Sequence, residues 1–127
     1  MSESSEMPEY VIEDHPLIGV LEKLDVQRVI DETAAQWVNQ TLCRVGDVVL
    51  RLGVLHGEFH WHKHDEEDEL FFVLDGHMRI ELEGMRAVEL GPRQMYIVPR
   101  GLHHRPVVPV RTTVLMLEQA GVVATGD

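Results

Sequence analysis

The fold of this chain is decided by residues 62–76, which read HKHDEEDELFFVLDG. His62 and His64 stand two residues apart, and side chains with that spacing lie on one face of a strand. Glu69 follows after a turn, at the start of the next expected strand. A second stretch, PRGLHH at residues 99–104, supplies the imidazole of His104. Three histidines and one carboxylate bind divalent transition metals, so the sequence predicts a metal site made of His62, His64, Glu69 and His104.

The apolar residues that surround these two stretches recur with a period of two. Short alternating runs separated by turn residues are typical of β-strands, and Asp75-Gly76 is typical of a two-residue hairpin turn. About eight such runs without intervening helices indicate an all-β sandwich or small barrel. The expected strands cover residues 48–55, 59–64, 70–74, 77–83, 86–90, 95–98, 102–108 and 111–118. The inward wall is expected to consist of Phe71, Val73, Met78, Ile80, Leu82 and Ile97.

Residues 1–41 have a different pattern and are predicted to form a partly helical or mobile arm. The first nine residues are polar, and chain ends of this kind are commonly mobile. Residues 17–30 have a weak helical period that follows Pro16, and residues 31–37 suit a further helical turn. The predicted organisation is therefore an arm over 1–41, a β-domain over 42–123 and a short tail over 124–127.

Composition excludes several classes of partner. The formal net charge is −11, with 22 acidic and 11 basic residues, whereas nucleic acids and anionic membranes attract basic surfaces. The sequence contains no apolar run long enough to span a membrane and no signal-peptide pattern at its start. Cys43 is the only cysteine, so an internal disulfide is impossible. We therefore expect a cytoplasmic protein that binds neither nucleic acid nor membrane.

The remaining histidines and acids have less specific interpretations. His60 shares the expected face of His62 and His64 and suits a pocket wall or a partner of a metal ligand. His103 is expected to point away from His104. The acids of residues 65–68 suit a solvated turn or the rim of a pocket, and Asp68 could orient an imidazole as a hydrogen-bond acceptor.

The pattern His62-x-His64-x4-Glu69-x6-Gly76, followed by Pro99-x-Gly101-x2-His104, resembles the two conserved motifs of the cupin superfamily. The resemblance covers roughly residues 42–123 and is closest to small single-domain bacterial cupins of the mannose-6-phosphate-isomerase-like kind. It implies a double-stranded β-helix, or jelly roll, in which His62, His64, Glu69 and His104 ligate one metal ion. It also implies a homodimer. The chain departs from the family pattern where Arg93 replaces a usual Gly and Val108 a usual Asn.

Two functions are compatible with these features. The first is a metal-dependent oxygenase, isomerase or lyase that acts on a small organic molecule in the barrel, with Fe, Mn, Ni, Co, Cu or Zn as the metal. The second is a non-catalytic cupin that binds a metal or metabolite and acts through a partner. No acid–base pair stands out besides the ligands, and Arg79 and Tyr96 are expected to face outward. A phosphosugar isomerase is disfavoured because it requires Lys or Arg inside the pocket.

Overall fold

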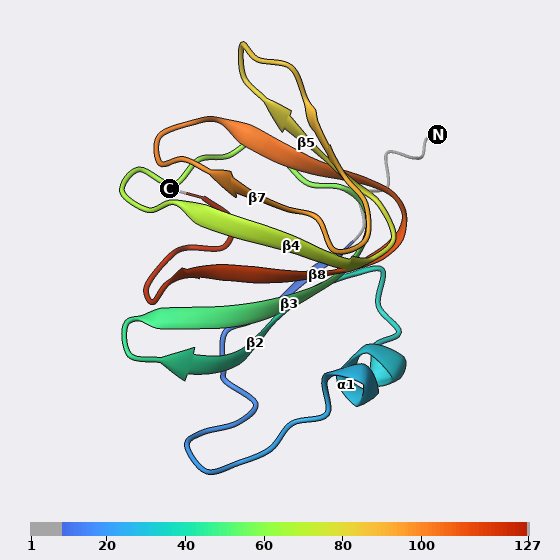
Figure 1. The fold of residues 1–127 in the computed structure, drawn as a ribbon, viewed down its shortest axis with the longest axis vertical. Helices are drawn as coiled ribbons and strands as arrows, with labels where there is room; N and C mark the ends of the chain where they lie inside the picture. The colour runs from blue at the N-terminus through green and yellow to red at the C-terminus, as the bar shows by residue number, and fades with distance from the viewer. Residues whose placement is uncertain (1–8, 127) are drawn as a thin grey trace.

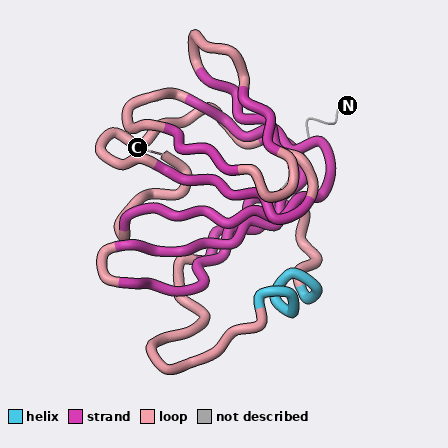
Figure 2. The backbone as a smooth tube through the Cα atoms, in the orientation of Figure 1, coloured by secondary structure: helices cyan, strands magenta, loops and turns pink. Residues whose placement is uncertain are grey.

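The structure is a computed structural model that describes residues 9–126, so the mobility predicted for residues 1–9 falls almost wholly outside the described residues. The described chain forms one helix and eight strands that belong to one sheet (Figures 1 and 2). The elements are β1 (Tyr10–Glu13), α1 (Val26–Glu32), β2 (Trp37–Val45), β3 (Val48–Glu58), β4 (Glu69–Asp75), β5 (Met78–Leu82), β6 (Val88–Leu90), β7 (Met95–Val98) and β8 (His104–Gln119). The predicted all-β fold is confirmed. Within residues 9–126, no helix is long and apolar enough to cross a membrane.

Strand β8 organises the sheet because its two halves have different neighbours. Its second half lies between β3 and β4, and its first half lies between β3 and β5. Between the halves the register with β3 shifts, since Leu55 faces Thr112 but Gly57 faces Val108. Pro109 lies in this shift, where a residue without an N–H is tolerated. One continuous strand therefore replaces the two strands predicted at 102–108 and 111–118.

The predicted strand at residues 59–64 is also wrong as a regular strand. This segment makes only an isolated bridge, between His62 and His104, in the described part of the chain. The total of eight strands nevertheless holds, because β1 and β2 add two strands that the sequence analysis did not foresee. Both lie wholly or partly in the residues assigned to the arm, where β1 pairs in parallel with β2.

The helix of the arm is shorter than predicted and begins later. Asp25 caps α1 by accepting hydrogen bonds from the backbone N–H groups of Gln27 and Arg28, at 3.1 and 3.4 Å. The preceding residues are not helical, because Leu17 and Ile18 instead donate to the carbonyl of Leu42. The apolar face of α1 covers the outer side of β2 and β3, where it packs on Leu42, Leu52 and Val54.

The inner side of the sheet holds the main core. Five of the six predicted wall residues are buried there, namely Phe71, Val73, Met78, Ile80 and Leu82. Ile97 is the exception and is 56% exposed. The pairing of β4 with β7 sets Tyr96 opposite Phe71, so Tyr96 and Val98 face inward and Ile97 faces outward. The predicted orientations of Ile97 and Tyr96 are therefore wrong, because the inward-facing positions of β7 are shifted by one residue from those expected.

Gly76 follows β4 but does not form the predicted β-hairpin, because β4 and β5 pair with different parts of β8. Its φ is +101°, and a Cβ atom at this position would lie 2.3 Å from Thr112 Oγ1 and 2.8 Å from Thr112 Cα. The glycine is therefore required by its close approach to the bend in β8.

Replacement of Gly76 with alanine is expected to lower the free energy of unfolding by about 2–4 kcal/mol, from left-handed strain and overpacking together. Gly84→Ala is the matched control, since Gly84 also has a positive φ (+73°) but an added Cβ would meet nothing within 4 Å. Urea unfolding compares the two. Equal losses in the two variants would show that the contact with Thr112 contributes nothing.

Candidate metal centre

The two sequence motifs meet because the segment before β4 runs beside the start of β8. His62 N–H donates to the carbonyl of His104 at 3.0 Å, and His104 N–H donates back to the carbonyl of His62 at 2.9 Å. Gly101 N–H donates to the carbonyl of His64 at 2.8 Å. Glu69 is the first residue of β4, which lies beside β8. Backbone hydrogen bonds therefore bring the four predicted side chains to one place.

The four side chains form a compact buried group. One possible ligand atom from each of His62, His64, Glu69 and His104 lies within 4.8 Å of the others. His64 Nε2 is 3.3 Å and His104 Nε2 is 3.7 Å from Glu69 Oε1. Each residue is at most 8% exposed. A carboxylate at this depth is costly unless a positive charge accompanies it.

The hydrogen bonds around the group suit a bound cation. His62 Nδ1 lies 3.0 Å from the carbonyl of His60, and His104 Nδ1 lies 2.9 Å from the carbonyl of Leu102. Because a carbonyl only accepts, we assign the proton of each ring to Nδ1, which leaves Nε2 as a ligand atom. His104 Nε2 and Glu69 Oε1 are buried and make no hydrogen bond within the described residues. The group can therefore hold a divalent metal ion.

A second buried carboxyl, which the sequence analysis missed, lies beside Glu69. Leu70 of β4 pairs with Leu117 of β8, so the next residues along the two strands are Glu69 and Glu118. Burial raises the pKa of Glu118 to about 9, and the charge of Glu69 acts in the same direction. Burial opposes ionisation of Glu69 as well, but in the metal-free group an imidazole of His104 or His64 that carries a proton on Nε2 holds the pKa of Glu69 below the ordinary range. Near neutral pH Glu69 is therefore charged and Glu118 holds a proton.

Arg51 is the second residue that the sequence analysis missed. Its side chain is 5% exposed, and its Nε lies 2.7 Å from Glu118 Oε1. Its Nη1 lies 2.8 Å from Asp14 Oδ1, and its Nη2 donates to the carbonyl of Val122 at 3.4 Å. A visible signal was the single charge of Arg51 within an otherwise apolar strand. Because the partner residues are distant in sequence, spacing could not identify them.

The other histidines and Asp68 have roles outside the buried group. His60 is exposed and its Nε2 lies 2.7 Å from the carbonyl of Thr125. His103 points away as predicted, and its Nδ1 lies 3.2 Å from Glu83 Oε1. Asp68 does not orient an imidazole, because it accepts hydrogen bonds from Arg100 N–H and Nε at 2.9 and 3.3 Å. Backbone carbonyls orient the rings of His62 and His104 instead.

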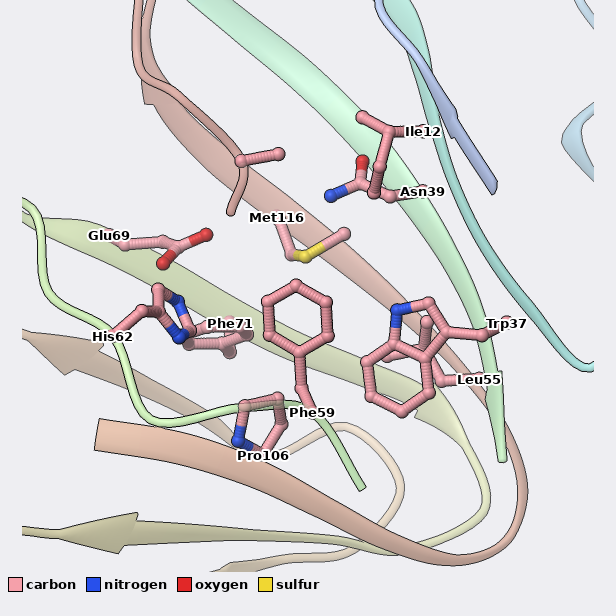
Figure 3. Close-up of a pocket in the computed structure, with 11 residues that line it drawn as sticks. Ile12, Trp37, Asn39, Leu55, Phe59, His62, Glu69, Phe71, Pro106 and Met116 are labelled. Carbon is pink, nitrogen blue, oxygen red and sulfur yellow. The ribbon is translucent and has the colours of Figure 1, made fainter. Parts of the chain in front are cut away.

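A small cavity reaches the buried group from the inner side of the sheet (Figure 3). Its volume is about 30 Å³, and His62 and Glu69 lie at one end of it. The rings of Trp37 and Phe59 stack on each other at 5.4 Å between centroids, and the side chain of Phe59 lies between Trp37 and His62. The cavity is lined by Ile12, Trp37, Asn39, Leu55, Phe59, His62, Glu69, Phe71, Pro106, Met116 and Ala124.

Comparison with known families matches residues 49–118 to the cupin domain. The chain belongs to the cupin family. Over 90 residues it is 33% identical to a Bacillus subtilis (strain 168) protein named "Uncharacterized protein YdbB". The match covers 71% of this cupin and 80% of the relative. The predicted cupin resemblance is thus confirmed.

Two solved structures show the same fold. A cupin-2 domain containing protein from Shewanella frigidimarina is 24% identical, with a TM-score of 0.71 over 76% of this cupin and 93% of the other chain. Hydroquinone 1,2-dioxygenase from Sphingomonas sp. TTNP3 is 14% identical, with a TM-score of 0.72 over 80% of this cupin. This cupin spans 33% of the dioxygenase chain. At these identities the two structures establish the fold alone.

Burial lowers the pKa of His62 to about 4, which predicts a pH dependence of stability in the metal-free cupin. The unfolded chain binds this proton below about pH 6.5, whereas the folded chain resists it down to about pH 4. The free energy of unfolding therefore falls by up to about 3 kcal/mol as the pH drops from about 6.5 to about 4. Above about pH 6.5, His62 does not make the free energy of unfolding depend on pH.

Urea unfolding of the metal-free wild type and a His62→Gln variant between pH 7.5 and pH 4 measures this effect. The expected result is a smaller decrease in the variant than in the wild type. Parallel curves would show that His62 protonates equally in both states.

Proposed function

We propose that this cupin is a mononuclear metal enzyme of the oxygenase, isomerase or lyase class that acts on a small organic molecule. The observation that carries the proposal is the cavity that ends at His62 and Glu69, because a ligand there would lie next to the metal ligands. Structural metal sites are instead closed by protein on all sides. A bound Fe, Mn, Ni, Co, Cu or Zn ion would supply Lewis-acid or, for the redox-active metals, oxygen-activating chemistry.

The walls of the cavity favour a neutral, compact substrate. Aromatic rings of Trp37, Phe59 and Phe71 surround it, and Asn39 is a polar lining residue away from the proposed ligands. None of the described residues that line it is Lys or Arg. An anionic phosphosugar would therefore enter without a protein cation to accompany it, which disfavours that class. The structurally similar hydroquinone dioxygenase was solved with 4-hydroxybenzoate bound, and a small aromatic substrate suits this cavity's walls as well.

Metal loading followed by activity screening tests the proposal. The metal-free cupin is reconstituted anaerobically with each of the six metals, and bound metal is measured by elemental mass spectrometry. About one equivalent per chain is expected. Oxygen uptake and product formation are then followed with small phenols and ketones. Failure to retain any of these metals after anaerobic reconstitution would overturn the proposed enzyme.

A non-catalytic binding module is the second candidate, and the small volume of the cavity favours it. At about 30 Å³ the cavity has room for little more than a water molecule or two. In addition, among the described residues that line the cavity, the proposed ligands His62 and Glu69 are the only acids or bases. The module predicts about one tightly held metal per chain without turnover of any screened compound, whereas the enzyme predicts turnover that disappears on metal removal.

We also propose that the cupin is a homodimer that associates through the outer face of its sheet. Apolar side chains align in two rows across β3, β8, β4 and β7. The first row consists of Leu50, Leu117, Leu70 and Ile97, and the second of Leu52, Leu115, Phe72 and Met95. The helix α1 covers the Leu52 end, whereas Ile97 and Met95 are 56% and 58% exposed. Because neither row contains a charge, two acidic copies could meet there without bringing like charges face to face.

Light scattering after size-exclusion chromatography measures this association. The wild type is expected to be a dimer and Ile97→Glu a monomer, since the substitution places a charge within the apolar face. Val20→Glu is the control, because Val20 is 89% exposed and is not one of the residues of the two rows. A wild type that remains monomeric at high concentration contradicts the proposal.

A further inference from the structure

The segment that follows β8 turns back over the buried histidines. Val122 is 6% exposed, and its carbonyl accepts the hydrogen bond from Arg51. Ala124 lines the cavity together with His62 and Glu69. The carbonyl of Thr125 lies 2.7 Å from Nε2 of His60. Ala124 therefore forms part of the cavity wall, and we call residues 124–126 the cover.

Gly126 brings the cover into direct contact with His62. A Cβ atom built on Gly126 would lie 2.6 Å from His62 Cβ and 3.2 Å from the carbonyl oxygen of Lys63. The φ of Gly126 is +100°, which side-chain-bearing residues rarely adopt. Only glycine therefore allows the chain to lie this close to a proposed metal ligand.

The cover is attached more weakly than the strands. Beyond Val122, the hydrogen bonds that the structure gives for this segment are the His60–Thr125 contact and a turn bond from Gly126 N–H to the carbonyl of Val123. Both His60 and Thr125 are exposed to solvent, and the cover pairs with no strand in the described residues. Segments with few buried contacts and exposed hydrogen bonds open at low free-energy cost.

With the cover in place, the cavity is too small for most organic molecules. Its volume is about 30 Å³, whereas an apolar cavity that holds benzene measures about 150 Å³. A ligand with more than a few non-hydrogen atoms can therefore reach His62 and Glu69 only if part of the wall moves. The lining residues outside the strands are Phe59, His62 and Ala124. Backbone hydrogen bonds to Pro106 and His104 hold the first two, whereas Ala124 belongs to the cover.

We infer that residues 124–126 determine which molecules reach the metal centre. In the closed position they admit only molecules of about one to three non-hydrogen atoms, such as water or dioxygen. Displacement of the cover admits the organic ligand and exposes His62. This inference rests on the proposed function, since it concerns the size of the ligand that acts at that site.

Labelling of histidines with diethyl pyrocarbonate tests the cover without any metal. The reagent acylates imidazole and is larger than the closed cavity, so His62 should react only when the cover is open. Peptide mass spectrometry gives the rate at His62 relative to His103, whose side chain is 44% exposed and serves as the reference within each sample. The test uses the full, metal-free chain.

Gly126→Val is expected to raise the relative labelling rate of His62 by on the order of tenfold, which corresponds to a loss of about 1.4 kcal/mol from the closing equilibrium. The matched control is Gly84→Val, which introduces the same side chain at a positive φ with nothing within 4 Å of an added Cβ. The control should leave the rate at His62 unchanged. His60→Ala, which removes an exposed side chain and its contact with Thr125, should change the rate in the same direction as Gly126→Val.

Three results would overturn the inference. The first is that His62 of the wild type is labelled as fast as His103. The second is that the labelling rate of His62 is unchanged in both Gly126→Val and His60→Ala. The third is that Gly84→Val raises the labelling rate of His62 as much as Gly126→Val does. Metal content is measured separately, so a cupin that retains no metal contradicts the proposed enzyme. Faster His62 labelling in Gly126→Val would still support the cover in that case.

Discussion

Replacement of His62 and His104 together with alanine is expected to reduce bound metal from about one equivalent per chain to background. The two rings come from different segments that are joined by a pair of backbone hydrogen bonds, and both orient Nδ1 toward a carbonyl. Their loss leaves one imidazole and one carboxylate, which are too few to hold a divalent transition metal tightly. Elemental mass spectrometry after anaerobic reconstitution measures the effect.

Two single substitutions serve as controls for the metal measurement. His103→Ala removes the histidine next to His104, and His60→Ala removes the histidine two residues before His62. Both side chains are solvent-exposed and lie outside the buried group. Each control should bind as much metal as the wild type. Its melting temperature should be higher with the metal than without it, because a ligand that binds the folded state stabilises it. Full metal in the double variant would rule out the proposed ligands.

Replacement of Arg51 with methionine is expected to lower the free energy of unfolding by about 3–5 kcal/mol. The guanidinium is buried and contacts Glu118, Asp14 and the carbonyl of Val122. Its removal leaves the carboxyl of Glu118 and the carbonyl of Val122 without the guanidinium, and each buried polar group left without a partner costs about 1–3 kcal/mol. Urea unfolding of the metal-free protein measures the loss.

The control for Arg51 is Arg28→Met, because Arg28 forms an exposed pair with Glu32 one helical turn away. That pair should contribute less than about 1 kcal/mol. An Arg51→Met/Glu118→Leu double variant should recover part of the stability, since replacing both partners with apolar groups removes the buried polar atoms together. If Arg51→Met and Arg28→Met lose the same stability, then the Arg51 contacts do not stabilise the interior.

The sequence by itself predicted the histidines and the carboxylate of the buried group. His62 and His64 are two residues apart, and their common direction depends only on the local pleat. Glu69 and His104 belong to short motifs whose turn residues are visible in the sequence. The period of two also predicted the inward side chains of β4 and β5. All of these features repeat within a few residues of chain.

Other features depend on pairing between distant strands. The register of β4 with β7 determined that Tyr96, and not Ile97, faces inward. The shift around Pro109 made one strand from two predicted ones, and it also placed Thr112 against Gly76. Local propensity does not specify such registers, because each is determined by the packing of the whole sheet.

For this cupin, then, the sequence alone determined the all-β fold and the identity of the four side chains that can hold a metal. Only the tertiary structure revealed the surroundings of those side chains, namely Glu118 beside Glu69, Arg51 behind Glu118, and Gly126 against His62. The physical reason is that donor type and strand period are local properties of the chain. Burial, pKa and access to the site depend instead on residues that the folded sheet brings together from Asp14 to Gly126.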